Sequence, residues 1–274
     1  MINRIGICFN PFKSEYMKIA DYTRKIIEDM GFEIAFSYDI TISSNECFKE
    51  KIDLLIAFGG DGTVLKAFHS VNFEKPILGI NFGRLGFLTY YHPKDLKMVL
   101  SKIKEGNYNF VEFPIFEVYD ESGNWEFCGI NDIVIAKNDT KILDVSLKVD
   151  SCDLGEIPAD GLVISSQLGS TAYNLSNGGA VISSKLKKVF EISFISPHVM
   201  TARPIVISSD EVAEVSINRE ENSAFLAVDG MKKTKLSPNE VIKIRYTEKN
   251  AKLLSVDEKK FYKLLIEKIG WGKR

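Results

Sequence analysis

Ile52-Asp53-Leu54-Leu55-Ile56-Ala57-Phe58 runs directly into Gly59-Gly60-Asp61-Gly62-Thr63, and this stretch decides the fold of the first third of the chain. A nearly continuous apolar run, charged only near its start, is typical of a strand buried on both faces of a parallel sheet. Val64–His69 follows with a helical pattern. Ligands of open α/β sheets gather beyond the carboxyl ends of strands, so the glycine loop lies where a binding site is expected.

The segments around this stretch alternate between strand and helix patterns. We expect further strands over Arg4–Phe9 and Pro76–Ile80, because both are short, apolar and rich in β-formers. We expect helices over Ser14–Met30 and Pro93–Lys104, each with a glycine just past its end. This alternation predicts an α/β domain.

From about residue 109 the pattern becomes mostly β. Turn residues separate the strand-like segments, and Asp229-Gly230 is typical of a hairpin turn. We therefore predict an α/β N-terminal domain (1–107), a mostly β, sandwich-like C-terminal domain (108–256) and a C-terminal helix (257–274) that packs back on the body. The strand-like segments are Phe110–Tyr119, Trp125–Lys137, Ile142–Val149, Gly161–Ser165, Ile205–Ile207, Val212–Ile217, Ala224–Val228 and Val241–Tyr246, and the amphipathic pattern at the end covers Glu258–Ile269.

Composition narrows the class of protein. The 274 residues include 35 Lys and Arg against 37 Asp and Glu. The net charge of −2 therefore gives no indication of a surface that binds nucleic acid or an anionic membrane. The longest apolar runs are too short to span a bilayer, and the first residues read as a strand and not as a signal peptide. The four cysteines and three histidines are scattered, so we expect no metal cluster, reduced thiols and a cytoplasmic location.

The glycine loop has the properties of a phosphate site, with one exception. Its glycines let a phosphate approach the backbone, the helix N-terminus adds partial positive charge, and Lys66 adds a full charge. Asp61 is the exception, because a carboxylate repels phosphate. It makes sense if it takes a proton from a hydroxyl nucleophile or holds a magnesium ion. The alternative is that Asp61 merely caps the helix; neither familiar nucleotide-binding glycine signature is complete here.

Three further segments have the composition of ligand contacts. Asp160–Gly179 places a dense Gly/Ser/Thr turn after a strand, where Tyr173 either stacks on a base or packs in the core, and an ordinary surface loop is the alternative. Asn131-Asp132 is a polar pair in a strand-like stretch, with a bulge or strand end as the alternative. For the glycine turn over Ile80–Leu88 we slightly favour a simple connection.

These segments, in this order, resemble the NAD kinase family. The matching motifs are GGDGTVLKA from Gly59, GRLGFLT from Gly83, Asn131-Asp132, DGLVIS…GSTAYNLSNGG from Asp160, RPIVI from Arg203 and VDG from Val228. The resemblance implies a two-domain fold with NAD bound between the domains. It also implies transfer of the γ-phosphoryl of ATP, or in some members of polyphosphate, to the 2′-hydroxyl of the adenosine ribose of NAD. The family generally depends on a divalent metal, usually Mg²⁺, and bacterial members are usually homodimers or homotetramers.

The resemblance also implies roles for individual residues. Asp61 matches the catalytic aspartate of the family. The nucleotide-contacting loop and helix are matched by Gly59, Gly60, Gly62, Thr63 and Lys66. The NAD-binding surface is matched by Asn131, Asp132, Asp160, Thr171, Ala172, Tyr173 and Ser176. No residue is assigned as a dedicated metal ligand.

The chain departs from the family pattern in three places. Asp132 stands where Glu is common, Ser166-Gln167-Leu168 replaces Thr-Pro-Thr, and Pro158-Ala159 replaces a basic residue and a glycine. These changes bear on the choice of phosphoryl donor and on the preference for NAD or NADH as the acceptor. Two rival hypotheses are a lipid kinase of the diacylglycerol or sphingosine type, which shares GGDGT, and a non-catalytic NAD-binding regulator.

Overall fold

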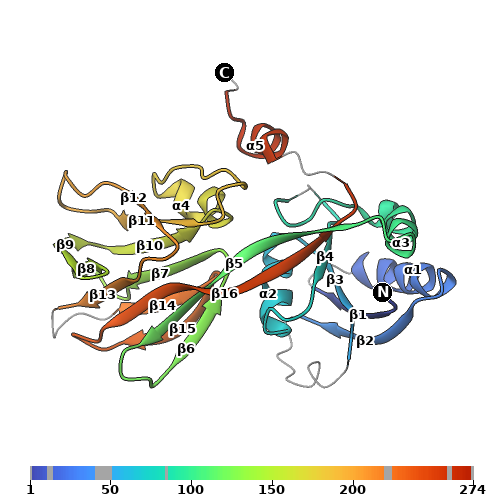
Figure 1. Cartoon of the computed structure of the whole chain (residues 1–274), viewed down its shortest axis with the longest axis horizontal. Helices are drawn as coiled ribbons and strands as arrows, with labels where there is room; N and C mark the ends of the chain where they lie inside the picture. Colours follow the sequence, from blue (N-terminus) through green and yellow to red (C-terminus); the bar gives the residue numbers. More distant parts are fainter. Residues whose placement is uncertain are drawn as a thin grey trace. The chain divides into compact units, whose positions relative to one another are not determined.

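The computed structural model describes residues 2–10, 15–40, 51–83, 86–218, 224–257 and 261–272. The chain forms two compact units, drawn in Figure 1: Met1–Glu112 together with Ala251–Arg274, and Phe113–Asn250. The sequence analysis placed the corresponding boundaries after residues 107 and 256. The C-terminal helix, which we expected to pack back on the body, belongs to the first unit.

The first unit is a parallel sheet covered by helices. Its strands follow the order β2-β1-β3-β4, and the end of β16 pairs in parallel with β4 through Leu253 and Ile77. In Figure 1, α2 lies on one side of these strands and α1 and α3 on the other. The elements are β1 (Arg4–Phe9), α1 (Glu15–Asp29), β2 (Glu33–Asp39), β3 (Leu54–Phe58), α2 (Asp61–Ser70), β4 (Ile77–Ile80), the 3₁₀ turn η2 (Pro93–Asp95), α3 (Leu96–Lys104) and α5 (Phe261–Ile269).

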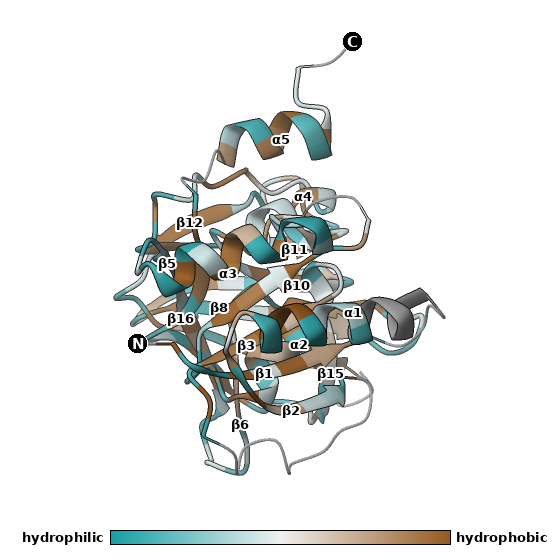
Figure 2. Cartoon of the chain, turned by 90° about the vertical axis from the view of Figure 1, so that its right-hand side faces the viewer, coloured by the Kyte–Doolittle hydropathy of each residue, from teal (hydrophilic) through white to brown (hydrophobic). Residues whose placement is uncertain are grey.

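Hydrophobic patterning explains these elements. All five residues of β3 are buried, as expected for a strand inside a parallel sheet. Helix α3 buries Leu96, Val99, Leu100 and Ile103, which recur at the spacing of one helical face. Figure 2 shows that α3 and α5 both carry hydrophobic and hydrophilic residues. In the part of the chain that the structure describes, no helix is long and apolar enough to cross a membrane.

The second unit is a sandwich of two sheets. One sheet has the order β12-β11-β10-β7-β14-β15, and the other joins β16, β13, β8 and β9, with β5 beside β16 and β6 beside β5. Their facing apolar side chains form one core, which includes Phe116, Leu147, Ile164 and Ile192. The strands are β5 (Asn109–Asp120), β6 (Glu126–Gly129), β7 (Asp132–Lys137), β8 (Leu143–Val149), β9 (Cys152–Ala159), β10 (Gly161–Ser166), β11 (Val189–Ile195), β12 (Ile205–Ser208), β13 (Ala213–Ile217), β14 (Ala224–Val228), β15 (Met231–Leu236) and β16 (Ile242–Ser255).

The predicted fold class, an α/β unit followed by a mostly β sandwich-like unit, is confirmed. One predicted strand was wrong: Trp125–Lys137 is two strands, because β6 and β7 belong to different sheets and the chain crosses between them at residues 130–131. Asn131-Asp132 therefore lies at a strand start, one of the alternatives considered. The Asp229-Gly230 turn is confirmed, since both residues have positive φ, 50° and 73°, between the paired Val228 and Met231.

Candidate functional site

The carboxyl ends of β3 and β4 bring two loops to one edge of the parallel sheet. The two strands are neighbours, with Phe58 opposite Ile80, and the Gly59 amide donates to the Ile80 carbonyl at 2.9 Å. The glycine loop that follows β3 therefore meets the segment that follows β4. This is the edge at which a ligand site is expected in an open parallel sheet.

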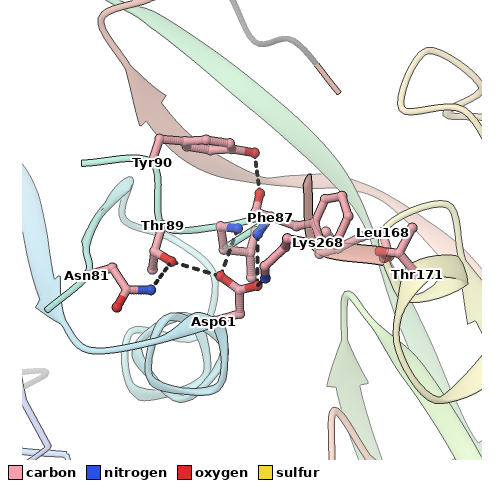
Figure 3. A network of polar contacts seen from close by, with 9 residues as sticks. Asp61, Asn81, Phe87, Thr89, Tyr90, Leu168, Thr171 and Lys268 are labelled. Carbon is pink, nitrogen blue, oxygen red and sulfur yellow. Dashed lines mark hydrogen bonds and ion pairs between the residues drawn. The ribbon is translucent and has the colours of Figure 1, made fainter. Parts of the chain in front are cut away.

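The Asp61 carboxylate lies at this meeting point and accepts four hydrogen bonds, drawn in Figure 3. Oδ1 accepts from the Leu88 amide and the Thr89 hydroxyl, each at 3.0 Å. Oδ2 accepts from the Phe87 amide at 2.8 Å and from Lys268 Nζ on α5 at 3.2 Å. A carboxylate has about four lone-pair positions, so all of them are engaged.

These contacts decide two of the alternatives left open by the sequence. The helix-cap interpretation of Asp61 was wrong, because the N-cap of α2 is Gly60 and the Asp61 carboxylate bonds to the turn after β4 instead. The interpretation of Ile80–Leu88 as a simple connection was also wrong, because Phe87 and Leu88 hold the carboxylate. Residues 84 and 85 of that turn lie outside the described residues.

A second layer fixes the donors around Asp61. Asn81 Nδ2 donates to the buried Thr89 hydroxyl at 2.9 Å, and that hydroxyl in turn donates to Asp61. The Tyr90 hydroxyl donates to the Phe87 carbonyl. Burial, with the negative charge of Asp61 as a lesser cause, raises the pKa of Tyr90 well above its ordinary value, so the phenol stays protonated and remains a donor. The carboxylate is thus held in one orientation.

The glycines of this region serve different purposes. A Cβ on Gly59 would overlap the Thr63 side chain, and one on Gly86 would overlap the Asp61 carboxylate, so packing requires both glycines. A Cβ on Gly60 or Gly62 would meet no atom of the described residues within 4 Å, and neither glycine has a positive φ. Neither packing nor backbone strain explains these two, which suits a loop that a phosphate approaches closely. Lys66 is exposed one turn further along α2.

Gly62→Ala should separate stability from binding. Alanine is favoured over glycine inside a helix by about 1 kcal/mol, so thermal unfolding should keep or slightly raise the wild-type Tm. If a phosphate binds at this loop, as the sequence predicts, the new methyl group takes up space beside it, so calorimetric affinity for the ATP or NAD that the family resemblance implies should fall at least about tenfold, roughly 1.4 kcal/mol. Gly59→Ala is the contrasting variant and should lose stability. Full affinity in Gly62→Ala would make the loop glycines mere turn residues.

In the second unit, Asp229 organises the Asn131-Asp132 pair. Its Oδ1 accepts from the backbone amides of Ile130, Asn131 and Asp132 at 3.1, 2.7 and 3.3 Å. Asn131 Nδ2 donates to Asp132 Oδ2 at 2.7 Å. Asn131 is partly exposed and Asp132 is buried, so of the two only Asn131 readily reaches a ligand.

The Asp132 carboxyl has a strongly shifted pKa. Burial is the main cause, and the neighbouring Asp229 carboxylate is the second. Together they raise the pKa of Asp132 from 3.8 to about 7, although the hydrogen bond from Asn131 acts in the opposite direction. The folded protein therefore holds this proton more tightly than the unfolded chain does. The stability that this proton provides is full below about pH 4 and is lost as the pH rises through about 7.

Asp132→Asn should remove this pH dependence. The amide has nearly the same shape and carries no charge at any pH, so the variant should gain stability relative to wild type between pH 5 and pH 8. Between these two pH values the gain is about 3 kcal/mol, because the window covers roughly two of the shifted pKa units at 1.36 kcal/mol each. Urea unfolding at both pH values measures it. A constant difference between the two proteins across this range would show that Asp132 titrates normally.

A buried polar network supports the Gly/Ser/Thr turn after β10. Ser166 Oγ donates to the Ile130 carbonyl at 2.6 Å, and the Ser166 amide donates to the Asn131 carbonyl at 3.0 Å. Asn174 donates to Glu191 Oε2 at 2.7 Å and accepts from Ser193 at 2.7 Å. These side chains are fully or almost fully buried, so they hold the turn in place and are not available to a ligand.

The predicted contact residues of this turn face outward. The 3₁₀ turn η3 (Gly169–Thr171) and the short helix α4 (Tyr173–Ser176) present partly or fully exposed Thr171, Ala172 and Ser176. The Tyr173 side chain is 46% exposed, so its alternative as a core residue was wrong. Within this unit, Asn131 lies beside the same turn.

Asp160 does not join this group. It precedes β10, whereas Asn131-Asp132 and residues 171–176 lie at the other end of that strand, about 17 Å away at 3.3 Å per residue. Its carboxylate pairs instead with Lys137 Nζ at 2.5 Å. Within the second unit, the structure therefore separates Asp160 from the other predicted contacts.

Four residues that support Asp61 or Asn131 in the structure were not among the predicted site residues. Asn81, Thr89 and Asp229 each stood inside a motif quoted from the sequence, but nothing in the pattern showed that their side chains support Asp61 or Asn131. Lys268 stood in a segment identified only as an amphipathic helix. No local signal connects it with Asp61, which lies 207 residues away in the chain.

Comparisons with protein families match both units. Residues 10–108 match the model of the ATP-NAD kinase N-terminal domain, and residues 130–256 match that of the ATP-NAD kinase C-terminal domain. The chain is 34% identical to a NAD kinase of Clostridium beijerinckii over 98% of this chain and 96% of the relative. It is 31% identical to a NAD kinase of Natranaerobius thermophilus over 98% of both chains.

Solved structures share the fold. The yeast NADH kinase complexed with NADH matches with a TM-score of 0.89 at 18% identity, covering 100% of this chain and 89% of the other. A NAD kinase from Archaeoglobus fulgidus in complex with ATP matches with a TM-score of 0.77 at 24% identity, covering 97% and 98%. At these identities the structural matches support the fold alone.

Proposed function

The chain belongs to the NAD kinase family, and from this membership we propose which of its residues carry the phosphoryl group from ATP to NAD. As a NAD kinase, it phosphorylates NAD with ATP and produces NADP. The lipid-kinase hypothesis and the non-catalytic regulator are thereby wrong.

Asp61 is the proton acceptor of this reaction. The observation that supports the assignment is the clamp of two backbone amides and a buried hydroxyl, which holds the carboxylate at the carboxyl edge of the parallel sheet. Phosphoryl transfer depends on positioning and charge neutralisation more than on covalent help. A carboxylate in a fixed orientation directs the ribose 2′-hydroxyl toward the phosphorus atom and takes its proton late in the transfer.

The loop around Asp61 binds phosphate groups. The open backbone at Gly60 and Gly62, the N-terminus of α2 and the exposed Lys66 support this assignment, whereas Gly59 and buried Thr63 shape the turn. Among the described residues, no group of three or more His, Cys, Asp or Glu side chains could hold a metal by itself. Mg²⁺ would be held mainly by the phosphates of ATP, with Asp61 as the nearby carboxylate, and would supply neutralisation of the phosphate charge.

The second unit binds the adenosine part of NAD. Asn131, Thr171 and Ser176 offer hydrogen-bonding groups for the ribose and base, Asp132 orients Asn131, and Tyr173 offers an exposed ring for stacking. Ala172 provides an exposed backbone position beside them. Asp160 stays a prediction for a separate contact, because it lies at the other end of β10.

Asp61→Asn tests the chemistry. Asn has the same size but cannot take a proton as a carboxylate does, so kcat should fall by about 10²–10⁴-fold while NAD affinity changes little. The amide group replaces one acceptor opposite the backbone donors, so a stability loss of about 1–3 kcal/mol is also expected. Calorimetry with NAD, thermal unfolding and NADP formation measure the three effects. Turnover within a few-fold of wild type would remove Asp61 from the chemistry.

Tyr173→Ala tests the binding surface of the second unit. Loss of stacking on a base costs about 1–3 kcal/mol, so the KM for NAD should rise by about 5- to 150-fold with little change in Tm. Tyr22→Ala, at an exposed tyrosine of α1, is the matched control and should behave as wild type. An unchanged KM for NAD in Tyr173→Ala would place the adenine elsewhere.

Three properties complete the proposal. ATP is the donor that the family name supports, and offering polyphosphate in its place tests the alternative. Exposed Ile205 and Val206 on the edge strand β12 suit contact with a second copy, so light scattering should give the mass of two or four chains. The balanced charge and scattered cysteines suit a cytoplasmic location, which a fluorescent fusion would reveal.

A further inference from the structure

Helix α5 presents one inward face to the Asp61 clamp. Phe261, Leu265 and Lys268 follow one another at four and three residues, the spacing of a single helical face. Leu265 is buried, and the Phe261 ring lies 6.0 Å from the Phe87 ring. This face therefore seats α5 against the same turn that donates hydrogen bonds to Asp61.

Lys268 is the charged residue of this face, and its ammonium has two partners. Nζ lies 3.2 Å from Asp61 Oδ2 and 5.0 Å from the centroid of the Phe87 ring (Figure 3). The Lys268 side chain is 31% exposed and the Asp61 side chain 29%. An ion pair so open to solvent adds little to stability, so folding alone does not explain a cation at this position.

The four donors around Asp61 differ in how readily they can leave. Two are backbone amides of the turn, and the third is a buried hydroxyl held by Asn81. The fourth is the ammonium of Lys268, at the end of a flexible side chain. A substrate hydroxyl that donates to Asp61 needs one of the four lone-pair positions, and Lys268 is the donor that can give up its place.

We propose that Lys268 is a positioning residue for phosphoryl transfer: it holds the Asp61 carboxylate in the free enzyme and yields that place to the ribose hydroxyl. The inference rests on the proposed role of Asp61. The displaced ammonium stays on α5 beside the reacting groups, where its positive charge favours the anionic phosphoryl group as it transfers. The ribose oxygen forms a new bond to the γ-phosphorus of ATP, and its proton passes to Asp61. The bond between the γ-phosphorus and the bridging oxygen breaks, and ADP leaves with the electrons of that bond.

Lys268→Met should lower kcat on the order of 10²-fold, the scale of losing one preorganised charge-stabilising donor, with less than about a threefold change in the KM for NAD. Methionine keeps the apolar stem, so Tm should be nearly unchanged. Lys268→Arg keeps the charge and should recover most of the lost kcat. The matched control is Lys263→Met on the same helix, because Lys263 is 68% exposed and, among the described residues, forms its ion pair within α5 with Glu267; it should behave as wild type.

A comparison of Lys268→Met, Asp61→Asn and the double variant separates this inference from the assignment of Asp61. The Lys268 ammonium holds the Asp61 carboxylate in the free enzyme and then acts on the phosphoryl group, so part of its effect persists without the carboxylate. The double variant should therefore be slower than Asp61→Asn alone, but by less than the product of the two single losses. Wild-type or raised kcat in Lys268→Met, with Asp61→Asn inactive, overturns the role of Lys268 and leaves that of Asp61 intact. Normal turnover in Asp61→Asn overturns both. Should Lys268→Met fold poorly, Lys268→Gln with the arginine variant gives the same comparison.

Discussion

The parallel pairing of β3 with β4 is the constraint on which the candidate site of the first unit depends. Because the strands run in the same direction and are adjacent, the loops after Phe58 and Ile80 emerge at one edge. A Cβ on Gly79 would overlap the Leu88 carbonyl, so the second loop folds back tightly over its own strand. This close return brings the amides of Phe87 and Leu88 to the carboxylate that begins α2.

The second unit uses a carboxylate in a comparable structural way. Asp229 sits in a hairpin turn, and its side chain satisfies backbone amides where the chain crosses from one sheet to the other. Such a crossing leaves amide groups without strand partners, and a buried amide without an acceptor is costly. The Asp229 carboxylate therefore permits an irregular segment, with the partly exposed Asn131, to exist between two regular sheets.

Local patterns in the sequence predicted local structure well. The strand Arg4–Phe9, the buried strand before Gly59 and the Asp229-Gly230 turn follow from hydrophobic runs and turn chemistry, and the structure confirms them. The strand β9 was missed because its residues are mostly exposed and alternate poorly. The stretch over Trp125–Lys137 was read as one strand because periodicity cannot reveal that a chain changes sheets.

For the candidate site, too, the sequence predicted residues within local motifs but not the contacts between distant segments. Motif resemblance identified Asp61 and the turn around Tyr173, whereas the partners of Asp61 are set by long-range packing. Thr89 and Lys268 lie 28 and 207 residues from it, and no pattern within a short window specifies such distances. The burial of Asp132 beside Asp229, and with it the raised pKa, likewise depends on three-dimensional neighbours.

Gly86 has a consequence for how this family of sequences can change. Since any side chain at position 86 would occupy the volume of the Asp61 carboxylate, the two positions form a single mutational unit. A variant that enlarges residue 86 must move the carboxylate, and a variant that moves the carboxylate removes the reason for the glycine. Drift at either position is thereby restrained by the other, although 25 residues of chain separate them.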